Sequence, residues 1–200
     1  GLVLLNDMAL TNAYGLLPSL LPDGDYNWQG KLLALGATLA VASTRAFGWR
    51  ETGLTLQQAP EGRGWAAVVL VLYAGVFLAL ALVLPNEPAS RERVAFQLTM
   101  PGLEEETFYR GILLLALVRA FTGRTRFLGV EWSWGALVSS ALFGLAHAFG
   151  FGAGRFSFDP LAMILTAGPS LFAVWLALRT RSVLLPILLH NFGNAIVLLV

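Results

Sequence analysis

The chain has 200 residues, of which 56% are hydrophobic and only 12% are charged, and its formal net charge is +1. Ordinary soluble domains carry about 25% charged residues, so this composition argues against a water-soluble fold. A nucleic-acid partner is not expected either, because such a partner needs a concentrated basic face. The sequence contains no cysteine, which excludes disulfides, a cysteine nucleophile and thiolate metal sites.

Apolar segments in the first half of the chain predict transmembrane helices, each of which needs about 20 largely apolar residues. The segment 65–85 meets this length, whereas 32–44 approaches it only if the helix continues towards Phe47. The segment 1–21 is compatible with a span, an interfacial helix or part of a longer helix. It is apolar but contains three polar side chains, Asn6, Asp7 and Asn12.

The second half is expected to begin with a break at Pro101 and Gly102, because proline followed by glycine interrupts a continuous helix. A new helix is predicted over 103–119. Its first turn would hold three carboxylates in a place where the helix dipole favours negative charge, namely Glu104, Glu105 and Glu106. Three further spans are predicted at 132–149, 161–178 and 183–200.

Together these segments predict an all-α protein, a polytopic transmembrane bundle of about six to eight helices. No long polar linker divides the chain, so residues 1–200 are expected to form a single integral membrane domain. If the spans alternate in direction, the basic residues divide unequally between the two sides, and the richer side is the cytoplasmic one. The richer set is Arg45, Arg50, Arg63, Arg119, Arg124, Arg126, Arg179 and Arg181, and the poorer set is Lys31, Arg91, Arg93 and Arg155.

Ionisable groups inside membrane spans are costly unless they are paired or hydrated, and they are therefore functional candidates. The first group lies on the predicted helix 103–119. Glu106 and Arg110 are four residues apart on one helical face, where they can form an ion pair. Glu105 points about 100° away from Glu106 round the helix axis, so it is free for another role.

Two further groups contain the only two histidines of the chain. Phe143 precedes His147 by four residues, and His190 shares a helical face with Asn194. Each residue alone has an ordinary explanation: a phenylalanine packs in a core, and an intramembrane histidine or asparagine bonds to a neighbouring helix. Carboxylates at a helix start are usually solvated. The occurrence of both histidines and the Glu pair in three separate spans favours a common site.

These residue types suit the hydrolysis of a peptide bond. Glu105 and His147, expected at similar depth near one membrane face, could share a water molecule and act as its general base. The ring N–H of His190, expected deeper in the bundle, and the Asn194 amide could stabilise the resulting oxyanion. Arg110 would neutralise Glu106 and hold the helix in register.

The three motifs Glu105-Glu106-x-x-x-Arg110, Phe143-x-x-x-His147 and His190-x-x-x-Asn194 resemble those of the CPBP family. This family comprises CAAX prenyl endopeptidases and bacteriocin-processing or abortive-infection proteins, and it is regarded as a family of glutamic intramembrane proteases. The resemblance covers residues 101–200, the expected catalytic half. It implies a helical bundle with a conical intramembrane cavity, in which Glu105 and His147 activate water while His190 and Asn194 stabilise the oxyanion.

The resemblance also implies supporting roles for Glu106 and Arg110, and Phe143 belongs to the same motif set. No metal or other cofactor is implied. The expected partners are the lipid bilayer and a peptide or lipidated protein that is cut near its terminus. The expected location is a prokaryotic cytoplasmic membrane. Glu104 has no counterpart in the two-glutamate pattern.

Two other hypotheses fit the same residues. Glu105, His147 and His190 could bind zinc and leave a fourth position for water, although the chain lacks the His-Glu-x-x-His pattern of many zinc proteases. Alternatively, the buried glutamates and histidines could relay protons in a transporter or bind a partner in a non-enzymatic membrane scaffold.

Overall fold

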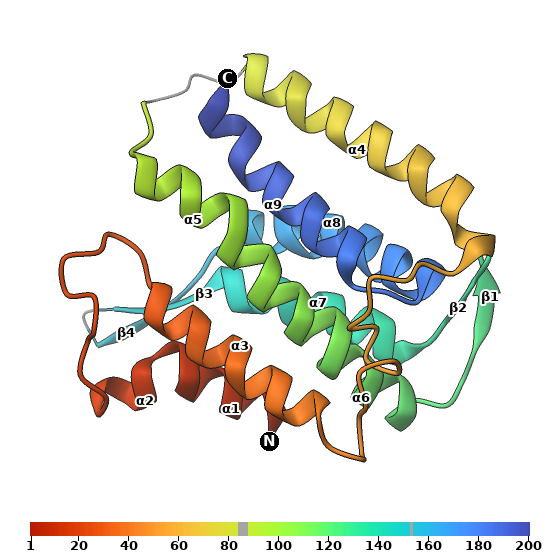
Figure 1. The fold of residues 1–200 in the computed structure, drawn as a ribbon, viewed down its shortest axis with the longest axis horizontal. Coiled ribbons are helices and arrows are strands. Elements are labelled where there is room, and N and C mark those ends of the chain that lie inside the picture. Colours follow the sequence, from red (N-terminus) through yellow and green to blue (C-terminus); the bar gives the residue numbers. More distant parts are fainter. Residues whose placement is uncertain (84–87, 153) are drawn as a thin grey trace.

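The computed structural model describes residues 1–83, 88–152 and 154–200, and helices make up 69% of it (Figure 1). The helices are α1 (Leu2–Leu10), α2 (Asn12–Gly15), α3 (Trp28–Ala42), η1 (Pro60–Gly62), α4 (Arg63–Val83), α5 (Arg91–Pro101), η2 (Gly102–Leu113), α6 (Leu114–Ala120), α7 (Trp134–Ala148), α8 (Pro160–Thr180) and α9 (Leu184–Leu199). Two antiparallel hairpins pair β1 (Thr125–Phe127) with β2 (Val130–Trp132) and β3 (Phe149–Gly152) with β4 (Arg155–Phe158). The predicted all-α helical bundle is confirmed.

Side-chain caps explain where several helices begin. Asn27 accepts a hydrogen bond of 3.0 Å from the backbone N–H of Gly30 at the start of α3. Asp159 accepts from the N–H of Leu161 at 2.9 Å, and Pro160 occupies the first position of α8. A capping side chain followed by proline is a common helix start, because proline has no N–H to leave unpaired there.

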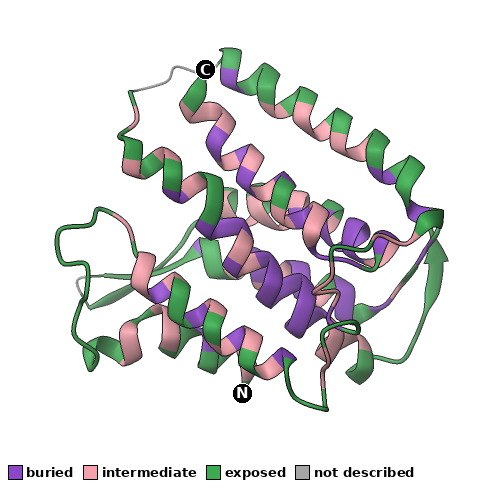
Figure 2. Ribbon diagram, in the orientation of Figure 1, coloured by how far each residue is buried: buried purple, intermediate pink, exposed green. Residues whose placement is uncertain are grey.

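Two helices of the described chain are long and apolar enough to cross a membrane, Pro60–Val83 with 24 residues and Pro160–Thr180 with 21. Within the most apolar window of the first, only 11% of the residues are buried. Its exposed side chains include Val71 and Leu72, and Figure 2 shows α4 largely exposed along its length. A continuous apolar surface of this size is stable against lipid and not against water. The end of the predicted span 65–85 lies outside the described residues.

The predicted helix break at Pro101 and Gly102 is wrong. The helix α5 continues through η2, which is π-helical, into α6. Asn191 on α9 explains the continuity, since its side-chain oxygen accepts from the Gly102 N–H at 2.7 Å and its amide donates to the Thr99 carbonyl at 3.1 Å. The tertiary structure therefore supplies partners for backbone groups beside a proline that would otherwise interrupt the helix.

The run α5–η2–α6 forms the centre of the bundle. In Figure 1 it crosses the middle of the molecule, with α3 and α1 on one side and α9 and α4 on the other, while α7 and α8 lie behind it. The segment η2 contacts α3, α7, α8 and α9. Figure 2 shows that this central run is the most continuously buried part of the chain.

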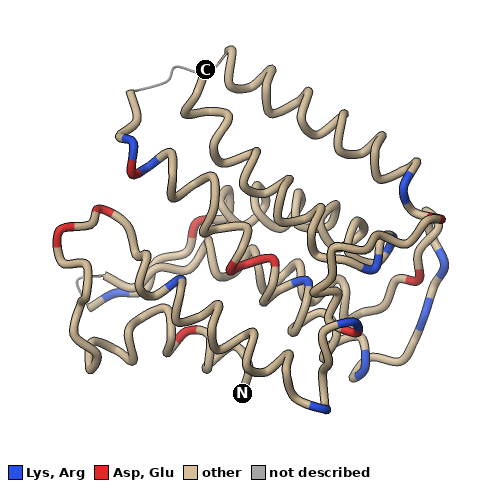
Figure 3. The backbone as a smooth tube through the Cα atoms, in the orientation of Figure 1, with Lys and Arg blue, Asp and Glu red and all other residues tan. Residues whose placement is uncertain are grey.

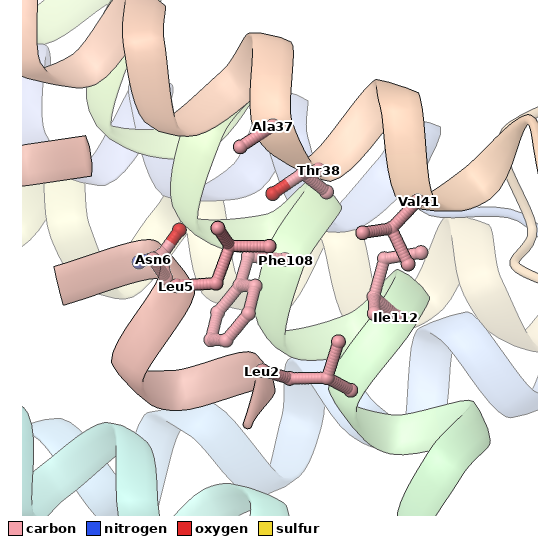
Figure 4. Close-up of a pocket in the computed structure, with 8 residues that line it drawn as sticks. All are labelled: Leu2, Leu5, Asn6, Ala37, Thr38, Val41, Phe108 and Ile112. Atoms are coloured by element: carbon pink, nitrogen blue, oxygen red, sulfur yellow. The ribbon is translucent and has the colours of Figure 1, made fainter. Parts of the chain in front are cut away.

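The packing around η2 is dense and mainly apolar. Phe108, Tyr109, Leu113 and Phe143 form one buried cluster. Phe108 also points between α1 and α3, where it lines a pocket of about 10 Å³ with Asn6 and other side chains of these helices (Figure 4). A space of this size holds at most about one water molecule, so the N-terminal helices are closely packed on η2.

Several predicted boundaries shift because of the hairpins and the N-terminal turn. The span predicted over 132–149 is α7, which has 15 residues because Trp132 pairs in β2 and Phe149 begins β3. The helix α1 ends at Leu10, and positive φ angles follow at Asn12, so residues 1–21 do not form one continuous span. The spans predicted at 161–178 and 183–200 agree closely with α8 and α9.

Candidate active site

All seven residues predicted for the site line one cavity of about 450 Å³. The segment η2 contributes Glu105, Glu106 and Arg110, α7 contributes two residues and α9 contributes two. The residues of α7 and α9 are Phe143, His147, His190 and Asn194. Three motifs that are separated by up to 89 residues in the chain are thus brought to one place by the packing of η2 against α7 and α9.

Glu105 faces both histidines. Its Oε2 atom lies 3.6 Å from Nε2 of His147 and 3.9 Å from Nε2 of His190. These distances exceed those of a direct hydrogen bond, and a water molecule in the cavity beside these atoms could bond to more than one of them. The Oε2 atom is buried and has no hydrogen-bond partner among the described residues. A buried carboxylate oxygen aimed at two imidazoles is a suitable base for a water molecule held between them.

The ring of His147 is oriented by its own helix. Its Nδ1 atom lies 2.8 Å from the carbonyl oxygen of Phe143. A carbonyl can only accept a hydrogen bond, so Nδ1 carries the proton and Nε2 faces Glu105. Phe143, one turn earlier on α7, therefore fixes the tautomer of the histidine through its backbone.

The ring of His190 is oriented by Glu106. Its Nδ1 atom lies 2.7 Å from Glu106 Oε1, which leaves Nε2 directed towards Glu105. The other Glu106 oxygen lies 2.9 Å from Nε of Arg110, as the spacing of four residues predicted. Glu106 and Arg110 are 1% and 4% exposed, and the guanidinium lies 4.2 Å from the centre of the Phe143 ring. The buried Glu106–Arg110 pair thus lies against His190 and holds its ring through Nδ1.

The remaining predicted residue, Asn194, lies one turn after His190 on α9. Its amide nitrogen donates to Oε1 of Gln97 on α5 at 3.0 Å. An amide nitrogen carries two protons, so one stays available to the cavity. Gln97 also lines the cavity and was not predicted, because a single polar residue on α5 gives no pattern in the sequence.

The ordinary alternative, a solvated first turn at the glutamates, does not apply, because these residues lie inside a continuous helix run. Glu104 is fully buried and Glu106 nearly so. Lys31, which the sequence indicated only as one basic residue of the poorer side, ion-pairs with Glu104 at 2.6 Å and with Glu105 at 2.7 Å. Sequence reasoning missed this contact, because more than 70 residues separate the partners.

The fold and the cavity define a class of protein, a helical membrane protein with carboxylate and imidazole groups gathered within its bundle. Residues 92–196, more than half of the chain, match the family described as type II CAAX prenyl endopeptidase Rce1-like. The chain belongs to this family. No curated protein and no solved structure matches it significantly. The protein is accordingly an integral membrane peptidase of the CAAX protease type, acting on peptide or protein substrates at the bilayer.

Proposed function

We propose that this peptidase is a glutamic, metal-free intramembrane endopeptidase whose base is Glu105 acting together with His147. The observation that carries the proposal is the convergence of Glu105 Oε2 with the Nε2 atoms of His147 and His190 across gaps of 3.6 and 3.9 Å. A water molecule in the cavity beside these atoms would find acceptors for its protons in Glu105 and His147.

In the proposed reaction, Glu105 removes a proton from this water while the water oxygen attacks the peptide carbonyl carbon. The carbonyl π electrons move to the oxygen and give a tetrahedral oxyanion. The C–N bond then breaks, and the proton held by Glu105 passes to the leaving amine. His147 orients the water, since its Nδ1 proton is bound to Phe143 and its Nε2 faces the carboxylate.

His190 and Asn194 are proposed to stabilise the oxyanion. Because Nδ1 of His190 already bonds to Glu106, its Nε2 can donate only when the ring is an imidazolium. A charge count supports this form. The three carboxylates of the site, Glu104 to Glu106, are otherwise balanced only by Lys31 and Arg110. With a charged His190, the three negative and three positive groups are equal in number.

The alternative of a zinc protease is less well supported. Among the described residues, no group of three or more His, Asp and Glu side chains has the geometry of a metal site. The ammonium of Lys31 also lies 2.7 Å from Glu105 and places a positive charge beside a carboxylate that would have to bind the metal. Repulsion between an ammonium and a divalent cation would weaken such a site.

The proposed substrate is the terminal region of a membrane-associated or lipidated peptide. The cavity is bounded by Tyr73 and Phe77 on α4 and by Phe96 on α5, and α4 is the helix with the most exposed apolar surface. Aromatic walls beside a lipid-facing helix suit a substrate that carries an apolar group next to its scissile bond.

The test measures cleavage of a fluorogenic peptide in proteoliposomes, with and without a prenylated cysteine near its C-terminus. Glu105→Gln and His147→Ala should each lower kcat by about 100- to 10,000-fold, as is typical for the loss of a general base. Glu131→Gln, which changes an exposed carboxylate on β2, is the matched control and should cleave at the parent rate.

Parent-level cleavage by both Glu105→Gln and His147→Ala would contradict the assignment of the base. Chelator treatment and metal analysis separate the two chemistries. Stoichiometric zinc together with loss of cleavage in chelator would support the zinc alternative, whereas unchanged cleavage supports the metal-free reaction. Equal cleavage of the two peptides would show that the substrate needs no prenyl group.

A further inference from the structure

Lys31 is the only lysine in the 200 residues, and it lies outside the segment 92–196 that matches the peptidase family. It belongs to the first turn of α3, whose start is capped by Asn27. Its side chain is only 14% exposed and reaches into the cavity. A lysine side chain is rarely buried without a partner, because its charge is costly to remove from water.

The partners of Lys31 are two adjacent glutamates of η2. Its Nζ lies 2.6 Å from Oε2 of Glu104 and 2.7 Å from Oε1 of Glu105. Glu104 is fully buried, and these contacts are short, charge-assisted hydrogen bonds. Glu104 thereby anchors the ammonium, and its presence beside the Glu105-Glu106 pair is explained by Lys31.

Because of the contact with Lys31, the two carboxylate oxygens of Glu105 have different surroundings. Oε1 is held by the ammonium, while Oε2 is the atom that faces His147 and His190. Without Lys31, the carboxylate could rotate about its terminal bond, because such sp² torsions are soft. With one oxygen fixed, the other is directed at the position of the attacking water, and a misplacement of about 1 Å there can cost about 100-fold in rate.

We propose that Lys31 is a positioning residue of the peptidase, which holds Glu105 by one oxygen and aims the other at the two histidines. The inference rests on the proposed role of Glu105 as the base. The N-terminal part of the chain therefore contributes a residue to the active site, in addition to packing against the segment 92–196.

Kinetics of Lys31→Met and Lys31→Arg in proteoliposomes test the role. Lys31→Met should lower kcat at least about 10-fold and leave KM within about twofold, because the lost contact orients the base and does not bind the substrate. Lys31→Arg retains the charge and the hydrogen-bond donors, and its kcat should exceed that of Lys31→Met. Arg93→Met, which removes an exposed cation from α5, is the control and should match the parent.

A purely structural tether between α3 and η2 predicts another pattern. In that case Lys31→Met would lower the unfolding temperature while the folded fraction kept the parent kcat, and this result would overturn the proposal. Equal losses in Lys31→Met and Lys31→Arg, with the parent unfolding temperature, would overturn it as well, since a charge at this position would then be irrelevant.

A spectroscopic measurement tests the contact without altering Lys31. Labelling with ε-¹⁵N-lysine gives one side-chain signal, because the chain has a single lysine. Glu105→Gln should shift this signal and speed its proton exchange, whereas Glu131→Gln should leave it unchanged. A signal that is the same in the parent and in Glu105→Gln would overturn the inference, even if Lys31→Met does not fold.

The outcomes separate this inference from the proposed function. If Glu105→Gln cleaves as well as the parent, the proposed base is wrong, and the inference falls with it. If Glu105→Gln is inactive but Lys31→Met retains the parent kcat, only the role of Lys31 is refuted.

Discussion

Glu106 links two other side chains of the site, because each of its two carboxylate oxygens contacts a different residue. One oxygen bonds to His190 and the other pairs with Arg110, and both glutamate and arginine are buried. A buried ion pair adds little stability compared with apolar residues of the same shape, but the loss of one partner leaves an uncompensated charge. The ion pair is therefore expected to matter more for the orientation of His190 than for the free energy of unfolding.

This reasoning predicts an asymmetric response to substitution. Arg110→Met should lower the free energy of unfolding by about 3–5 kcal/mol, because it leaves the Glu106 charge buried without its guanidinium. The double variant Glu106→Gln with Arg110→Met should recover part of this loss. Denaturation of the purified protein in detergent measures both, and an equal or larger loss in the double variant would contradict the account.

At the scale of elements, the continuous run α5–η2–α6 depends on Asn191 of α9. This side chain accepts from the Gly102 N–H and donates to the Thr99 carbonyl, and it thereby ties the backbone on either side of Pro101 to α9. In the π-helical segment η2 that follows, Glu104 and Glu105 both contact Lys31, whereas Glu106 contacts His190. π-Helical turns occur frequently at functional sites in other proteins.

Asn191→Leu keeps the approximate shape of the side chain but removes both hydrogen bonds. The Gly102 N–H and the Thr99 carbonyl would keep only their contact with each other, and the loss of two side-chain hydrogen bonds, at about 0.5–1.5 kcal/mol each, should lower the unfolding midpoint. Asn194→Leu is the comparison, since that amide bonds to the side chain of Gln97 and not to the backbone. Asn194→Leu should lower activity more than stability. An unfolding midpoint lower in Asn194→Leu than in Asn191→Leu would refute the role given to Asn191.

Gly102 is a second position where the central run tolerates little change. An added Cβ atom would lie 2.5 Å from Oδ1 of Asn191 and 2.6 Å from the carbonyl oxygen of Ile187. Gly102→Ala should therefore destabilise the protein by about 1–3 kcal/mol, as overpacking usually does. Gly75→Ala on α4 meets open space and should be neutral or stabilising. Thermal unfolding of the two variants side by side checks the difference.

At the scale of the whole molecule, the basic residues gather mainly at one end of the bundle, near the β1–β2 hairpin (Figure 3). Arg50, Arg124, Arg179 and Arg181 line one cavity at that end. The opposite end carries the β3–β4 hairpin, because α7 connects the two hairpins. The excess of arginine predicts that the β1–β2 end faces the cytoplasm.

The absence of native cysteine allows this orientation to be measured directly. Thr125→Cys on β1 and Ser157→Cys on β4 place single thiols at exposed positions of the two hairpins. In sealed membranes with the outer face exposed, an impermeant maleimide should label only the Ser157→Cys variant, and Thr125→Cys should react after the membranes are opened. The unsubstituted protein is the blank, and the opposite labelling pattern would show that the orientation is inverted.

Features that depend on neighbouring residues could be predicted from the sequence alone. Apolar runs fixed α8 and α9 closely, because helix length and hydropathy are local properties. The spacing of four residues correctly predicted the pair of Glu106 with Arg110, since i and i+4 side chains meet on any helix. The three motifs also indicated the family before any packing was known.

Features that depend on contacts between distant segments became visible only in the folded protein. Lys31 contacts Glu105, which is 74 residues away in the sequence, and Asn191 bonds to the backbone of Gly102, which is 89 residues away. Proline and glycine favour a break in an isolated chain, but a partner on another helix adds hydrogen bonds to the backbone on either side of the proline and changes the balance. Local rules carry no information about such a partner, because its position is set by how the helices pack.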